Sequence, residues 1–322
     1  MLHYNRPPSF EKHDKLLGEI KEILHSRWVV NGSYTRQLEE HFKNKFKVKY
    51  ALACCNCTNG LIIAVKALNL AKDSIIAIPS FTWASTEYAA SCTSDWVEYI
   101  DIDRKSWLMD IKKLNNHHIA PDAIIAVDVF GNMFNSESID EEIPLLIDAA
   151  HGYGNSKLGH RGVIEVVSLA HTKLVFGWQG GIILTNNDDY YYRMKPLVEL
   201  SAKMTEVNAL IALYSASEYK NTLVTNYNII EAYRSMIRID FDEQYIPEET
   251  NHSVYAILFE NKKVRDKVAE NFKKNDIEVK IYYTPLEDTN NTRWVYNRIL
   301  ALPVYKDMEK DVELVCRQIN NI

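Results

Sequence analysis

Short apolar runs rich in β-branched residues alternate with helix-like segments through the first two thirds of this 322-residue chain. Between several of the runs, apolar residues recur at a spacing near 3.6, as at Leu61, Ile62, Val65 and Leu68. This alternation predicts an α/β fold, in which helices cover both faces of an open and mostly parallel sheet. The expected strands cover residues 50–54, 75–78, 96–100, 123–129, 145–147, 163–167 and 182–185.

The pattern changes near residue 204, where helical spacing begins and continues to residue 238. It is followed by an expected strand, a charged helix and a second strand, at 254–259, 262–274 and 277–282. These elements predict a smaller α+β domain. We therefore expect a large domain of residues 1–215 and a small C-terminal domain of residues 216–322.

Composition restricts the classes of function. Hydrophobic residues make up 47% of the chain and charged residues 25%, which is ordinary for a globular protein. The formal net charge is −6 and no basic block is present, so neither a nucleic acid nor an anionic membrane is favoured as a partner. The sequence shows neither an apolar run long enough for a bilayer nor a signal-peptide core, which predicts a cytoplasmic protein.

The five cysteines do not form a disulfide framework. Cys54 and Cys57 make a C-x-x-C motif, but a structural zinc site needs a second pair of ligands. No second pair has the required spacing, so we expect no metal.

Lys173 is the residue that most restricts the chemistry. It stands five residues after Ser168 and shortly before Gly180 and Gly181, and it lies downstream of an apolar run that ends at Asp148. Most lysines are simply exposed. This neighbourhood, however, is typical of a lysine that forms a Schiff base with the aldehyde of pyridoxal phosphate, a cofactor that also needs an acid beside its pyridine nitrogen.

The chain resembles the DegT/DnrJ/EryC1/StrS family of sugar aminotransferases over almost its whole length. The segments that carry the resemblance are 28–35, 38–42, 56–61, 79–86, 101–103, 127–132, 168–181, 202–206 and 282–286. Three of these segments carry variants of the family motifs: Phe-Gly-Asn at 130–132, Ala-Lys-Met at 202–204 and Tyr-x-x-Pro-Leu at 282–286. These variants look most like the branch that aminates C4 of nucleotide-linked 4-keto-6-deoxy sugars.

The resemblance implies the type I fold of pyridoxal-phosphate aminotransferases and a homodimer with shared active sites. It implies transfer of an amino group from an amino acid, with L-glutamate expected, to a nucleotide-linked keto sugar, with dTDP-4-keto-6-deoxyglucose expected. The reaction would follow a ping-pong cycle in amino sugar and polysaccharide biosynthesis.

By the same resemblance, Lys173 would carry the cofactor and then move a proton between two carbon atoms, which needs a free amine near neutral pH. Asp148 would keep the pyridine nitrogen protonated, although an aspartate at a strand end also caps turns. His151 stands where relatives place a glutamine or histidine against the ring phenolate. It could equally serve a local hydrogen-bond network.

The phosphate of the cofactor needs donors. Thr58 and Asn59 stand at the start of an expected helix, where free amides and the helix dipole attract anions. Ser168 would add a hydroxyl. A Thr-Asn pair before a helix is usually only a cap. Trp83 stands where the family keeps a flat side chain against the cofactor ring, although an isolated tryptophan more often belongs to the core.

The chain departs from the family at three places. The stretch between Thr185 and Met204 is shorter than the segment that reaches across the dimer in relatives. Ser201 replaces the asparagine that reaches the partner subunit's phosphate, and a shorter donor predicts a weaker or water-bridged contact. His171 is shifted by one position relative to the histidine of the family pattern.

Two alternatives remain open. The shorter segment would permit a transaminase that acts on a smaller keto or phosphorylated substrate. The other alternative is a catalytically weak protein that binds pyridoxal phosphate and regulates a sugar pathway. A dehydratase is disfavoured, because the dehydratases of the family replace the lysine with histidine and Lys173 is present.

Overall fold

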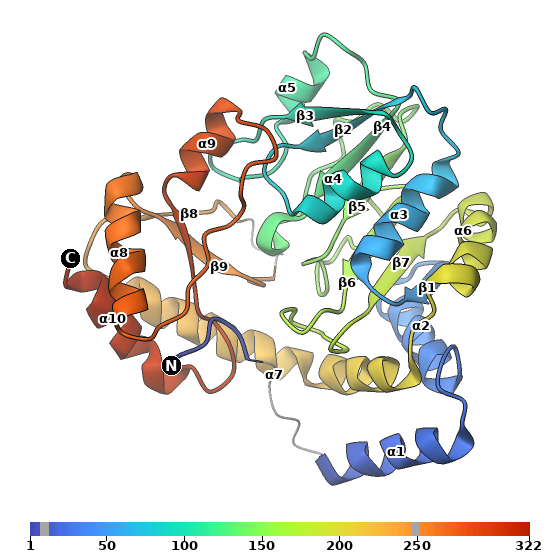
Figure 1. Cartoon of the computed structure of the whole chain (residues 1–322), viewed down its shortest axis with the longest axis horizontal. Coiled ribbons are helices and arrows are strands. Elements are labelled where there is room, and N and C mark those ends of the chain that lie inside the picture. Colours follow the sequence, from blue (N-terminus) through green and yellow to red (C-terminus); the bar gives the residue numbers. More distant parts are fainter. Residues whose placement is uncertain (7–12, 247–250) are drawn as a thin grey trace.

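A seven-stranded sheet forms the centre of the computed structural model, which describes residues 1–6, 13–246 and 251–322 (Figure 1). The strand order is β1-β7-β6-β5-β4-β2-β3. Strands β3, β2, β4, β5 and β6 run parallel, and β7 runs antiparallel to both β6 and β1. The strands are Tyr50–Cys54 (β1), Ile75–Pro79 (β2), Trp96–Ile100 (β3), Ala123–Val127 (β4), Leu145–Asp148 (β5), Ile164–Ser168 (β6) and Gly181–Thr185 (β7).

Helices cover both faces of this sheet. One face packs against α3 (Cys57–Leu68), α4 (Ala84–Ser91) and α6 (Asp188–Ser201). The other face packs against α2 (Ser33–Phe46) and α7 (Glu206–Met236), and α1 (His13–Ser26) lies outside α7. Burial on both faces explains why most strands appear as unbroken apolar runs in the sequence.

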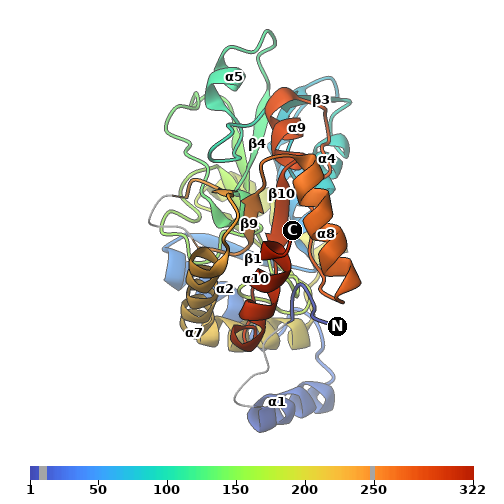
Figure 2. The same ribbon diagram turned by 90° about the vertical axis from the view of Figure 1, so that its left-hand side faces the viewer.

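The C-terminal part forms a smaller α+β unit beside the large sheet (Figure 1), and this unit faces the viewer in Figure 2. Its antiparallel sheet has the order β10-β9-β8, and its core also includes side chains from the second half of α7. The elements are β8 (Asp242–Glu243), β9 (Tyr255–Leu258), α8 (Lys262–Lys274), α9 (Asn290–Tyr296), β10 (Ile299–Leu302) and α10 (Val312–Asn320). Two short helical pieces, α5 (Ile111–Asn115) and the turn Val129–Gly131, complete the large part.

The predicted fold class is confirmed: a mostly parallel sheet between helices is joined to a smaller C-terminal α+β part. The strand expected at 277–282 is wrong, because Ile277 and Lys280 each make one isolated bridge, to Leu2 and Ala301 respectively. The predicted boundary after residue 215 stays a prediction. It falls within α7, a continuous 31-residue helix that packs against both α2 and α10.

A buried ion triad joins the carboxyl end of β4 to the start of β6. The Arg161 guanidinium donates to both oxygens of Asp128, at 2.7 and 2.8 Å, and to Glu165 Oε2 at 2.7 Å. All three side chains are almost fully buried. The backbone N–H of Asp128 donates to the Asp148 carbonyl at 3.0 Å, so the triad abuts the end of β5.

We expect Arg161→Met to destabilise the protein by about 3–5 kcal/mol, because it leaves two buried carboxylates without their cation. Urea unfolding of both proteins measures this change in the free energy of unfolding. Arg317→Met removes an exposed ion pair with Glu313 and should change stability by less than about 1 kcal/mol. Equal losses in the two variants would contradict a structural role for the triad.

Candidate active site

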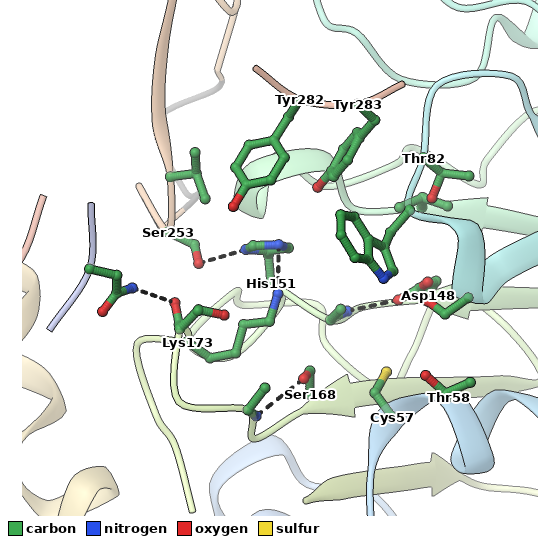
Figure 3. A pocket seen from close by; sticks show the side chains of 18 of the residues that line it. Cys57, Thr58, Thr82, Asp148, His151, Ser168, Lys173, Ser253, Tyr282 and Tyr283 are labelled. Carbon is green, nitrogen blue, oxygen red and sulfur yellow. Dashed lines mark hydrogen bonds between the residues drawn. The ribbon is translucent and has the colours of Figure 1, made fainter. Parts of the chain in front are cut away.

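A cavity of about 320 Å³ lies at the carboxyl ends of β5 and β6, where Asp148 and Ser168 end their strands (Figure 3). Carboxyl ends of parallel strands meet at one edge of a sheet, which is where α/β proteins bind their ligands. The first turn of α3, the loop before β7 that carries Lys173, and the segment around Tyr282 and Tyr283 also line the cavity. Its volume is within the range of small-molecule sites.

Lys173 reaches the middle of this cavity. Its Nζ lies 2.7 Å from His151 Nε2 (Figure 3). Burial lowers the pKa of Lys173 to about 8, although nearby Cys57 and Asp148 act in the opposite direction. A pKa this close to neutral leaves a useful fraction of the lysine as free amine, the form that attacks a carbonyl.

Asp148 is held as an acceptor at the end of β5. Its side chain is only 3% exposed. Thr86 Oγ1 donates to one carboxylate oxygen at 2.8 Å, and the Ala150 backbone N–H donates to the other at 3.1 Å. Burial raises the pKa of Asp148, while these two hydrogen bonds and Lys173 oppose that rise. The arrangement fixes the Asp148 carboxyl group beside the cavity.

Two of the three residues expected to bind the phosphate line the cavity, and the third does not. Thr58 and Ser168 both line the cavity. Asn59 does not belong to the cavity lining, because its side chain donates to Cys55 Sγ at 3.1 Å. Its backbone N–H is used by the Asn56 side chain, which caps α3. Asn59 therefore acts in the cap that the sequence also allowed.

Trp83 stands at the cavity immediately before α4 and is 60% exposed. Its ring meets Tyr283 edge to face, with centroids 6.3 Å apart. It is therefore not a core tryptophan. A large ring that stays exposed beside a cavity offers an apolar face to a planar ligand.

Several cavity residues were not singled out from the sequence. Ser253, Tyr4 and Asn5 lie far from the lysine segment in the chain and belong to no motif that marks them. Tyr283 lies within segment 282–286, so the family resemblance pointed to its neighbourhood without indicating a role. The same holds for Thr86 in segment 79–86, which is not part of the lining but donates to Asp148. The described residues contain no group of three potential metal ligands. In the same ranges, no helix is long and apolar enough to cross a membrane.

Comparison with known families decides the assignment, since residues 11–320 match the DegT/DnrJ/EryC1/StrS aminotransferase family. The chain belongs to this family. It is accordingly a pyridoxal-phosphate-dependent aminotransferase of the DegT type.

Three proteins similar to this DegT-family chain are 17% to 24% identical to it. Uncharacterized protein MJ1066 of Methanocaldococcus jannaschii is 24% identical over 360 positions, which cover 92% of this chain and 91% of that protein. DesI, solved in the presence of its TDP-sugar product, has a TM-score of 0.88 at 22% identity, covering 99% of this chain and 92% of DesI. Helicobacter pylori PseC, an aminotransferase involved in the biosynthesis of pseudoaminic acid, has a TM-score of 0.88 at 17% identity, with coverages of 99% and 98%. At these identities the structures establish a shared fold.

The residues at the cavity of this DegT-family enzyme fit the cofactor that the family binds. Lys173 offers an amine to an aldehyde, and Asp148 offers a carboxylate to a ring nitrogen. Thr58 and Ser168 offer hydroxyl donors to a phosphate. The three chemical requirements of pyridoxal phosphate are thus met by side chains that share one cavity.

Proposed function

We propose that this enzyme moves an amino group from L-glutamate to a nucleotide-linked keto-deoxy sugar, with dTDP-4-keto-6-deoxyglucose as the first candidate. The two half-reactions would share one site in a ping-pong cycle. The observation that carries the proposal is the cavity itself, in which the Lys173 amine lies beside His151 and near the buried carboxylate of Asp148.

The proposed roles follow from these positions. Bound pyridoxal phosphate supplies an aldehyde that accepts amines and a ring that stores electrons. Lys173 holds that group and then moves a proton through Nζ. Asp148 keeps a proton on the ring nitrogen, and His151 stands beside the amine and the expected ring oxygen. Thr58 and Ser168 bind the phosphate.

The sugar assignment rests on two supports. DesI was solved with a TDP-sugar product, and PseC acts in the biosynthesis of pseudoaminic acid, so neighbours in fold act on sugars. The motif variants at 127–132, 202–206 and 282–286 look like the branch that aminates C4 of 4-keto-6-deoxy sugars. A panel of nucleotide-linked keto sugars, incubated with enzyme and glutamate, should yield one product that gains an amine by mass spectrometry. Failure of the whole panel, with a normal reaction toward glutamate, would favour a smaller keto or phosphorylated substrate.

A regulatory protein that only binds pyridoxal phosphate is the alternative from another class. Glutamate added alone separates the two, because an aminotransferase converts its cofactor to the pyridoxamine form and changes the absorbance. A regulatory protein leaves the spectrum unchanged. The presence of Lys173, Asp148 and Ser168 together at one cavity supports the enzyme, because a protein that had lost catalysis would not need to keep all three.

We expect a homodimer whose partner completes each site. Large apolar side chains lie exposed on the single chain, among them Trp28 at 65%, Trp178 at 50% and Leu200 at 84%. A two-fold dimer is also the commonest arrangement of soluble homo-oligomers. Light scattering at micromolar concentration should give twice the mass of the chain. A fully active monomer would rule out shared sites.

Ser201 ends α6, where its hydroxyl donates to the Leu197 carbonyl at 2.9 Å. If Ser201 stands in for the asparagine that reaches the partner's phosphate, Ser201→Asn should tighten cofactor binding by about tenfold, the factor that 1.4 kcal/mol represents. Titration of both apo-proteins with pyridoxal phosphate measures this. Equal or weaker binding would show that the shortened segment has rebuilt this part of the site.

A further inference from the structure

Lys173 stands at one end of a hydrogen-bonded chain of three side chains. Its Nζ lies 2.7 Å from His151 Nε2, and His151 Nδ1 lies 2.8 Å from Ser253 Oγ (Figure 3). The three residues come from separate segments: the loop before β7, the turn after β5 and the approach to β9. The large sheet supplies the first two, and the C-terminal part of the chain supplies the third.

His151 is held in place from several sides. Asn251, which is buried, donates through Nδ2 to the backbone carbonyls of His151 and Tyr153, at 2.6 and 2.8 Å. The Phe130 ring meets the imidazole edge to face, with centroids 6.2 Å apart. The imidazole is therefore positioned to bridge Lys173 and Ser253 rather than to move freely in the cavity.

The chemistry of the chain follows from the donors available. Burial, followed by the charge of Lys173, lowers the pKa of His151 well below its usual value, so the ring is neutral and carries one N–H. When Lys173 is an ammonium, Nε2 accepts from it and Nδ1–H donates to Ser253. A hydroxyl both donates and accepts, so Ser253 can pair with either tautomer of His151. A carboxylate in its place would favour the Nδ1–H tautomer.

We propose that His151 and Ser253 form a proton relay between Lys173 Nζ and water in the cavity. The Nζ proton passes to Nε2, the Nδ1 proton passes to Ser253 Oγ, and the hydroxyl proton passes to water. Lys173 becomes an amine, the water gains the proton, and His151 and Ser253 end neutral. Ser253 lines the cavity and is partly exposed, so the relay has an outlet. Ser253 acts through His151 and is a positioning residue.

This inference rests on the proposed function, and a hydrogen label tests it. The holoenzyme reacts with L-glutamate that carries deuterium at Cα, in ordinary water, and the reaction is stopped early in the first half-reaction. The recovered pyridoxamine form is then analysed for deuterium by mass spectrometry. Lys173 takes up the deuteron as one of the three hydrogens of its ammonium group. Without exchange with water, about one deuteron in three is therefore passed on to the pyridoxamine form.

With the relay intact, exchange with water should reduce the returned label well below one third. Ser253→Ala should raise it several-fold, toward about one third. Ser253→Thr keeps the hydroxyl and should match the natural enzyme. Ser217→Ala removes a hydroxyl that donates to the Tyr214 carbonyl on α7, and it should also match the natural enzyme. Damage that is merely structural would slow the reaction without changing the fraction of label returned.

Equal label in Ser253→Ala and the natural enzyme, or a natural enzyme that already returns about one third, would overturn the relay. If glutamate does not react at all, the proposed donor fails and a second measurement decides on the relay. In the apo-protein, the ¹⁵N shifts of His151 should report both neutral tautomers in the natural and Ser253→Thr forms, and a changed ratio in Ser253→Ala. An unchanged ratio in the alanine variant would overturn the relay independently of the donor.

Discussion

Lys173→Ala should fold normally and lose turnover by about 10⁴-fold or more, because one change removes both the attachment point and the proton carrier. Within the described lining of the cavity, Lys173 is the only lysine, so no neighbour can replace it. The rate of the glutamate half-reaction measures the loss. Circular dichroism shows whether the variant is folded.

Lys112→Ala is the matched control for this change, since it removes an exposed lysine on α5 and should leave the rate unchanged. A Lys173→Ala enzyme that retains more than a few per cent of the natural rate would remove Lys173 from both roles.

Asp148→Asn should still bind pyridoxal phosphate and lose turnover by about 10²–10⁴-fold, because an amide cannot hold a proton on the pyridine nitrogen. The substitution is close to isosteric: the single asparagine oxygen can still accept from the Ala150 N–H, and the new NH₂ group can donate to Thr86 Oγ1, which now acts as the acceptor. Cofactor titration and the glutamate half-reaction measure the two effects separately.

Asp95→Asn changes an exposed carboxylate paired with Lys72 and serves as the control. Near-natural turnover in Asp148→Asn would show that this carboxylate only caps the end of β5. Loss of cofactor binding together with turnover would instead indicate that Asp148 acts mainly by shaping the cavity.

The sequence predicted the large sheet well because its strands are buried on both faces. All seven expected strands agree with the structure to within two residues. Periodicity does not reveal strand order or direction, so the antiparallel β7 between β1 and β6 could not be foreseen. The strand expected at 277–282 failed because its possible partners, Leu2 and Ala301, lie in separate segments and each pairs at a single position.

The sequence predicted those cavity residues that belong to a recognisable motif. Lys173, Asp148, His151, Ser168, Thr58 and Trp83 all lie at one cavity, and their roles remain predictions. Asn59 lies outside the cavity lining, because its side chain donates to Cys55 Sγ and its backbone N–H donates to Asn56, the cap of α3. Ser253 could not be found in advance. Its position depends on how the C-terminal part packs against the turn after β5, a contact between residues 102 positions apart.

The most direct test of the account is the identity of the lysine that carries the cofactor. Purified protein, loaded with pyridoxal phosphate and reduced with borohydride, should yield one modified peptide, and fragmentation should place the added mass on Lys173. Lys173→Ala, treated with the same amount of pyridoxal phosphate and reduced in the same way, should yield no modified peptide. A cofactor found on any other lysine of the natural protein, or natural protein that carries none, would contradict the central claim.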